Sequence, residues 1–229
     1  MTITVYFIRH AQAMSNVAAD VYPKGSLERL QVYQSEQYFN APLSPAGELQ
    51  AKTQLTKRFE DVAEVDVVYV STLLRTLQTA HHGLAKFHAA GSKTRWIASD
   101  VMREFSYSCQ KDGKHHPCNY RGPDSILQAE SAFPYLNYDG VQREDPIPKG
   151  ESMESVKGRV MEMLRLLQRY RTENTDGCDK NVVVVTHSGF LSMFYTCVFK
   201  NERWFENCEV AAESLDDVLS KAEQNGFNF

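Results

Sequence analysis

Basic side chains follow three apolar stretches that the sequence predicts to be buried strands. Arg9 and His10 come at the end of TITVYFI, and Arg75 lies one turn into the helix expected after VDVVYV. His187 and Ser188 follow NVVVVT. Guanidinium groups match phosphoryl oxygens with paired donors, and a neutral imidazole can attack phosphorus. These residue types therefore predict a site for an anion, most simply a phosphoryl group.

The elements that would position these residues alternate between strands and helices. Short, almost wholly apolar runs predict strands at 2–8, 65–70, 95–98 and 181–186. Capping residues and apolar spacings of three and four predict helices at 45–60, 73–89, 151–170 and 188–199, with Ser71 expected to cap the second. Such alternation predicts an α/β fold with three α/β/α layers and a mostly parallel sheet. The carboxyl ends of parallel strands meet at one edge, which would gather the basic side chains there.

The stretch 103–150 interrupts this alternation, because it holds five of the eight prolines and shows little periodicity. We expect it to be an insertion over one end of the sheet, within a single domain spanning 1–229. Its side chains are candidates for substrate specificity, with a solvated loop as the alternative. The polar candidates are His115, His116, Asn119 and Arg121, and the apolar ones are Tyr107, Tyr120 and Phe133.

Composition excludes several classes of protein. The net charge of -4, with charged residues of both signs, gives no reason to expect nucleic acid or an anionic membrane as partner. No apolar run approaches the roughly 20 residues of a membrane span, and the N-terminus lacks a signal-peptide layout. The five cysteines contain no C-x-x-C pair. We therefore expect a reduced, cytoplasmic protein, and the oligomeric state is left open.

The order of several motifs resembles the histidine phosphatase superfamily (branch 1), also called phosphoglycerate mutase-like. The matching stretches run from residue 3 to about 199: FIRHAQAMSN, LSPAGELQA, VYVSTLLRTLQTA, REF, PKGES and VVVVTHSGF. RHAQ, HHPCNYR and ENCEV are similar to a eukaryotic phosphomutase-like branch, which typically has H-P-C-D-x-R. Here Asn119 replaces that aspartate. No segment matches the E-R-H-Y-G of the glycolytic cofactor-dependent mutases.

The resemblance implies a role for each matching residue. His10 would be the nucleophile, and Glu104 would protonate the leaving group and then activate water. A set of polar side chains would bind the phosphoryl oxygens: Arg9, Asn16, Arg75, His187 and Ser188. No metal or other cofactor is implied, because the arginines supply positive charge.

Some alternatives stay open at this point. Glu104 could instead form a surface ion pair with Arg103, which would leave Asp100 or Asp112 as the acid. The pairs at 81–82 and 115–116 could suggest a metal site, but neighbouring helix residues point about 100° apart.

The favoured function is hydrolysis of a small phosphate monoester through a phosphohistidine. The alternatives are phosphoryl transfer of the phosphoglycerate mutase type and a non-catalytic phosphate-binding module.

Overall fold

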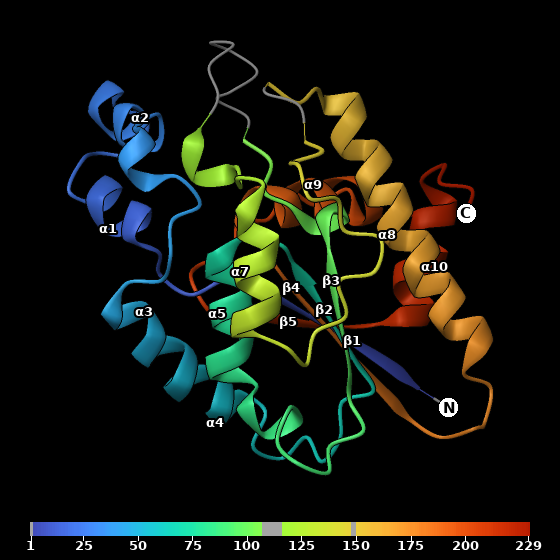
Figure 1. Cartoon of the computed structure of the whole chain (residues 1–229). Helices are drawn as coiled ribbons and strands as arrows, with labels where there is room; N and C mark the ends of the chain where they lie inside the picture. Colours follow the sequence, from blue (N-terminus) through green and yellow to red (C-terminus); the bar gives the residue numbers. More distant parts are fainter. Residues whose placement is uncertain (1, 107–115, 148–149) are drawn as a thin grey trace.

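A five-stranded sheet forms the centre of the computed structural model, which describes residues 2–106, 116–147 and 150–229 (Figure 1). The strand order is β3-β2-β4-β1-β5. The first four strands in the sequence pair in parallel and β5 pairs antiparallel with β1, so the predicted, mostly parallel sheet is confirmed. The strands are β1 (Ile3–Arg9), β2 (Val67–Ser71), β3 (Arg95–Ser99), β4 (Lys180–Thr186) and β5 (Val210–Ser214).

Helices cover both faces of the sheet, which explains why the central strands are apolar on both sides. In β4, Val184 belongs to the core beneath α8 (Met153–Glu173), α9 (Ser188–Phe199) and α10 (Leu215–Gln224). Its neighbours Val183 and Val185 belong to the opposite core. That second core is covered by α5 (Leu74–Gly83), α7 (Asp124–Ala132) and a helical run from α3 (Pro45–Gln50) through a π-turn (Ala51–Leu55) to α4 (Thr56–Arg58). The three-layer α/β/α prediction is confirmed.

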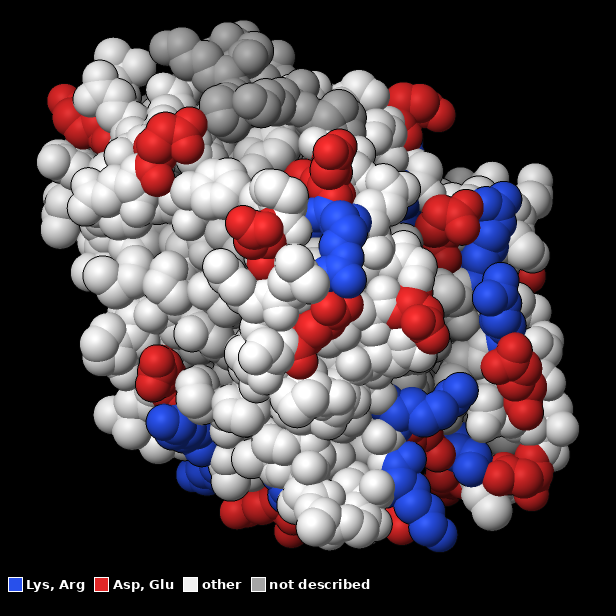
Figure 2. Space-filling model, viewed as in Figure 1, with Lys and Arg blue, Asp and Glu red and all other residues white. Residues whose placement is uncertain are grey.

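The remaining elements lie mainly around the carboxyl ends of the parallel strands. Two short helices follow β1 and lie together in Figure 1: α1 (Met14–Asp20) and α2 (Leu27–Tyr33). Single 3-10 turns complete the described elements at Glu36–Tyr38, Ala85–Phe87, Asp100–Met102 and Pro117–Asn119. None of the described helices is long and apolar enough to cross a membrane. Figure 2 shows basic and acidic side chains intermixed over the described residues of one face.

Two boundaries differ from the prediction around β2. Ser71 does not cap the next helix, because it is the last residue of the strand and its hydroxyl contacts the His187 ring. The helix starts at Leu74, with Leu73 in the capping position. It ends at Gly83, where a Cβ would meet the Leu55 side chain at 2.5 Å, and a 3-10 turn replaces its expected last part.

The segment predicted as an insertion over the end of the sheet has parts that lie in two different places. Its part from 116 to 121 lies at the carboxyl ends of the strands and contacts Arg75. Its later part instead packs on the α5 side, through Ala129 and Phe133, and extends the edge of the sheet. There the Asn137 main chain donates to Trp96 and accepts from Ala98, as a further strand would.

Candidate active site

His10 stands directly after β1 and is 3% exposed. Its Nδ1 lies 2.7 Å from the Ala11 carbonyl oxygen, which only accepts, so the ring proton belongs on Nδ1. Its Nε2 accepts a hydrogen bond from Nε of Arg75 at 3.1 Å. Burial, followed by the charges of Arg75 and Arg9, holds the pKa of His10 well below 6.5. The imidazole is therefore neutral, with its lone pair on Nε2.

Arg75 is fixed against His10 by the turn that begins at Pro117. Its Nη1 donates to the Cys118 carbonyl oxygen at 2.6 Å, and its Nη2 donates to Oδ1 of Asn119 at 3.0 Å. A guanidinium has five N–H donors, and these contacts with the bond to His10 use three of them. Two donors remain for an anion beside Nε2 of His10.

Two of the predicted phosphate-binding side chains each have a buried nitrogen that lacks a hydrogen-bond partner among the described residues. Nε of Arg9 is one, although Nη1 of the same side chain donates to the Phe205 carbonyl oxygen at 2.6 Å. Nδ1 of His187 is the other. Buried donors without partners are rare, because each one gives up its hydrogen bond to water. A bound anion is the kind of group that would satisfy both.

His187 is fully buried between β4 and α9, and its ring lies 5.1 Å from the His10 ring. Its Nε2 lies 2.8 Å from Oγ of Ser71. Burial and then the Arg75 charge hold its pKa well below 6.5, so the ring is neutral. If the Ser71 hydroxyl donates to Nε2, the ring proton lies on Nδ1, the atom without a partner. In that arrangement Ser71 sets the tautomer of His187, a role that sequence reasoning missed by assigning it to a helix cap.

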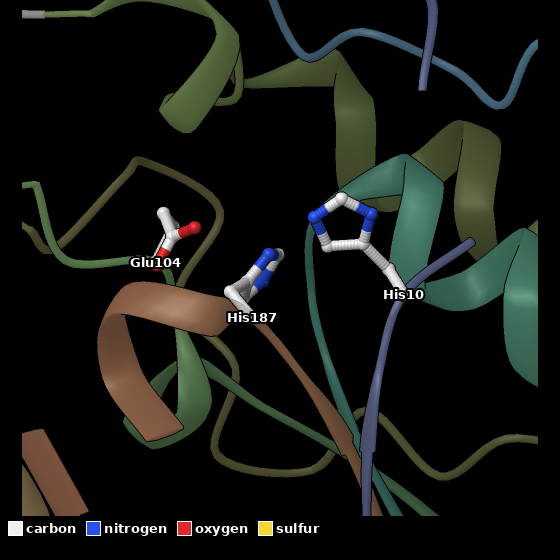
Figure 3. A group of neighbouring side chains, drawn as sticks. All are labelled: His10, Glu104 and His187. Carbon is white, nitrogen blue, oxygen red and sulfur yellow. The ribbon is translucent and has the colours of Figure 1, made fainter. Parts of the chain in front are cut away.

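In the view of Figure 3, Glu104 lies on one side of His187 and His10 lies on the other. One carboxyl oxygen of Glu104 and one ring nitrogen of each histidine all lie within 4.8 Å of one another. Oε1 of Glu104 accepts from the main-chain N–H groups of Phe105 at 2.9 Å and Phe190 at 3.2 Å. A carboxyl proton therefore belongs on Oε2. Burial raises the pKa of Glu104 although the Arg75 charge opposes that change.

The expected alternative for Glu104, an ion pair with Arg103, is wrong. Arg103 is fully buried and its guanidinium pairs with Asp145 at 2.6 Å and Asp100 at 3.4 Å. Asp100 also pairs with Arg121 at 2.9 Å, so it is not a free acid.

The trio in Figure 3 is the one group of histidine and acidic side chains, among the described residues, that is close enough to share a metal ion. Its surroundings oppose a cation. Arg9 and Arg75 carry positive charge beside it, and Nε of Arg75 occupies the His10 lone pair. The donor set therefore fits an anion better than a metal.

Two predicted phosphate ligands have local partners. Oδ1 of Asn16 accepts from the Ala13 main chain at 3.0 Å. Oγ of Ser188 donates to the Phe205 carbonyl oxygen at 3.1 Å and accepts from its N–H at 3.2 Å. Phosphate contacts by Asn16 and Ser188 stay predictions.

The specificity candidates of the insertion are mostly not free to meet a substrate. The prediction that Arg121 is available to contact a substrate is corrected by the structure. Its buried guanidinium pairs with Asp100 and donates to the main chain at 142 and 143. His116 is buried and stacked on Tyr33, and Phe133 belongs to the core. Tyr120 and Asn119 line a small cavity of about 20 Å³ beside Glu104. The candidates His115 and Tyr107, and the alternative acid Asp112, lie outside the described residues.

Comparisons with known proteins agree with this fold. A "phosphoglycerate mutase-like protein" of Arabidopsis thaliana is 26% identical over 211 residues, covering 82% of this chain and 72% of that protein. The ecdysone phosphate phosphatase of Bombix mori has a TM-score of 0.60 at 15% identity, covering 91% of this chain and 88% of that one. A phosphoglycerate mutase of Bacillus anthracis has a TM-score of 0.56 at 16% identity, covering 98% and 96%. At such identities the two structures establish a shared fold. The family model of the histidine phosphatase superfamily (branch 1) matches residues 5–216, and the chain belongs to that superfamily.

Proposed function

We propose that this protein hydrolyses small phosphate monoesters, without a metal ion, through a phosphohistidine at His10. The observation that carries the proposal is the hydrogen-bond geometry of the His10 ring. Its proton is held on Nδ1 by Ala11, and its lone pair on Nε2 faces a site lined by arginine donors. A neutral, oriented imidazole at an anion site is what nucleophilic attack on phosphorus requires.

In the first step the Nε–H of Arg75 turns from Nε2 of His10 to a phosphoryl oxygen, which frees the Nε2 lone pair. Nε2 of His10 then forms a bond to phosphorus while the bond from phosphorus to the ester oxygen breaks. Glu104 gives its proton to the departing oxygen, so an alcohol leaves. Arg75 turns its free donors to the phosphoryl oxygens, and Nδ1–H of His10 stays bonded to Ala11 as the ring gains charge. The donors on Arg9 and His187 that lack partners among the described residues add two more hydrogen bonds to those oxygens.

In the second step water attacks the phosphorus of the phosphohistidine. Glu104, now a carboxylate, takes a proton from that water, and the bond between phosphorus and Nε2 breaks. Inorganic phosphate leaves, His10 is neutral again and Glu104 is protonated again. One group serves as acid and then as base because burial raises its pKa toward the working pH.

Phosphoryl transfer of the phosphoglycerate mutase type is the second candidate. The names of the plant relatives and of the Bacillus anthracis structure favour it. Hydrolysis is preferred because no segment matches E-R-H-Y-G, and because other structural neighbours are named phosphatases. Measuring released phosphate against isomerised phosphoglycerate, with the same protein and substrate, separates the two reactions.

The direct test is to trap the phosphorylated enzyme. Wild-type protein mixed rapidly with radiolabelled phosphate monoesters should carry acid-labile phosphate on His10, and His10→Ala should carry none. His81→Ala, a change at a histidine outside the site, should keep the label. A wild-type protein that forms no phosphohistidine and releases no phosphate with any of the monoesters tested would instead be a non-catalytic binding module.

A further inference from the structure

Arg159 forms a buried, two-pronged ion pair on the inner face of α8. Its Nε and Nη2 donate to the two carboxylate oxygens of Glu151 at 2.8 and 2.5 Å. Its Nη1 donates to the carbonyl oxygens of Val101 at 2.9 Å and Arg103 at 2.7 Å. All three nitrogens of the guanidinium are thus in use. The ion pair holds the main chain that leads directly into Glu104.

The same guanidinium also contacts Phe190, whose main chain binds the Glu104 carboxyl group. Its carbon lies 5.1 Å from the centroid of the Phe190 ring, within the range of a cation–π contact. The Phe190 main-chain N–H is one of the two donors to Oε1 of Glu104. Arg159 therefore touches both the residue before Glu104 and a residue that fixes its carboxyl group.

A buried ion pair such as Arg159–Glu151 is expected to add little net stability to the fold. Burying two charges removes them from water, and this loss offsets much of their attraction. A planar guanidinium with five fixed donors, in contrast, defines positions well. The hydrogen bonds of the Arg159 guanidinium to the described residues go to Glu151 and to the main chain before Glu104. These contacts lead to the acid and not to the phosphate-binding side chains.

We propose that Arg159 and Glu151 are positioning residues that hold the Glu104 carboxyl group where it can protonate the leaving oxygen. This inference rests on the proposed function. A positioning role predicts different effects on two kinds of substrate, whereas a general structural role predicts the same effect on both. The two residues matter for substrates whose leaving group needs a proton, and matter little for substrates whose leaving group departs as a stable anion.

The test compares kcat/KM for an alkyl phosphate and for 4-nitrophenyl phosphate, whose phenolate leaves without protonation. This constant reports the steps up to phosphoryl transfer to His10, before Glu104 acts as base. Arg159→Lys keeps the charge but loses the paired guanidinium donors. Glu151→Gln keeps the shape but loses the charge. Each should lower kcat/KM for the alkyl ester by about 10- to 100-fold, part of the contribution of a general acid. For the nitrophenyl ester we expect a change of no more than about threefold.

A matched control and a double variant complete the experiment. Arg165→Lys changes an exposed arginine of the same helix, paired with Glu162, and should alter neither constant. Arg159→Lys added to Glu104→Gln should cause no further loss with the alkyl ester, because no acid is left to position.

Several results would overturn the proposal. One is an equal loss on both esters in Arg159→Lys or Glu151→Gln protein that keeps the wild-type circular dichroism spectrum. Another is an additive loss in the double variant. A wild-type protein that cleaves neither ester would overturn the proposed function, and this inference with it. If Arg159→Lys does not fold, Glu151→Gln carries the same comparison.

Discussion

Asn119→Asp should move the pH dependence of activity upward, because it places a negative charge on the far side of Arg75. Oδ1 of Asn119 accepts from Nη2 of Arg75 at 3.0 Å, and Nε of the same guanidinium donates to His10 at 3.1 Å. A carboxylate at this position partly cancels the arginine charge. That charge lowers the pKa of His10 and also the pKa of Glu104, so both pKa values should rise.

The size of the shift follows from this geometry. Two hydrogen bonds with a guanidinium between them place the new charge within about 8 Å of Nε2 of His10, which corresponds to at least about 2 kcal/mol at an effective dielectric constant of about 20. That energy equals about 1.5 pKa units, and solvent at the mouth of the site reduces it to about one. The same repulsion should raise the Ki of inorganic phosphate about tenfold.

The assay is kcat/KM for an alkyl phosphate against pH, with the Ki of inorganic phosphate measured at each pH. The acid limb reports protonation of His10, and the alkaline limb reports loss of the proton from Glu104, so both should move to higher pH. Asn119→Ser controls for the lost hydrogen bond, and Asn201→Asp adds the same charge at an exposed position. If Asn119→Asp and Asn119→Ser have the same pH limbs and the same Ki, the electrostatic reasoning is refuted.

Three further predictions use other contacts of the site. Arg75→Lys keeps the charge but loses the planar donors, and should lower kcat/KM about 100-fold in steady-state assays. Gly189→Ala puts a Cβ 1.9 Å from a main-chain oxygen and 2.8 Å from Oε1 of Glu104, and should lower the free energy of unfolding in urea by about 1–3 kcal/mol. His10 and His187 have lowered folded-state pKa values, so the unfolded chain binds more protons below pH 6.5. The melting temperature should therefore fall from pH 7.5 to 5.5, and fall less in His10→Asn.

The parts of the fold that the sequence predicts are those with one dominant physical signal. The predicted strand at 181–186 is β4, whose valines are buried on both faces, and the predicted helix at 188–199 is α9. β5 was not predicted because Val210–Ser214 is a short edge strand, whose sequence VAAES has no long apolar run and few strand-favouring residues. It pairs antiparallel with β1, so the sequence does not show the strand–helix–strand alternation that indicates a parallel strand.

The basic half of the site was predictable for a topological reason. Arg9, His10 and His187 follow parallel strands, and parallel pairing alone brings the ends of those strands together. Arg121 was misjudged because its partner Asp100 lies 21 residues away, and only the folded chain brings the two together. A side chain in an irregular segment has no periodicity to show which way it points.

The sequence does hold a signal for Arg159. Val156 and Met163 lie on the buried face of α8, and Arg159 stands three residues after the first and four before the second. It therefore shares their face. An arginine on the apolar face of an amphipathic helix must have a buried partner, because an unpaired charge there is too costly. Helical spacing alone thus marks Arg159 as a residue with a buried partner, whereas its target, the main chain before Glu104, is 56 residues away and follows only from the fold.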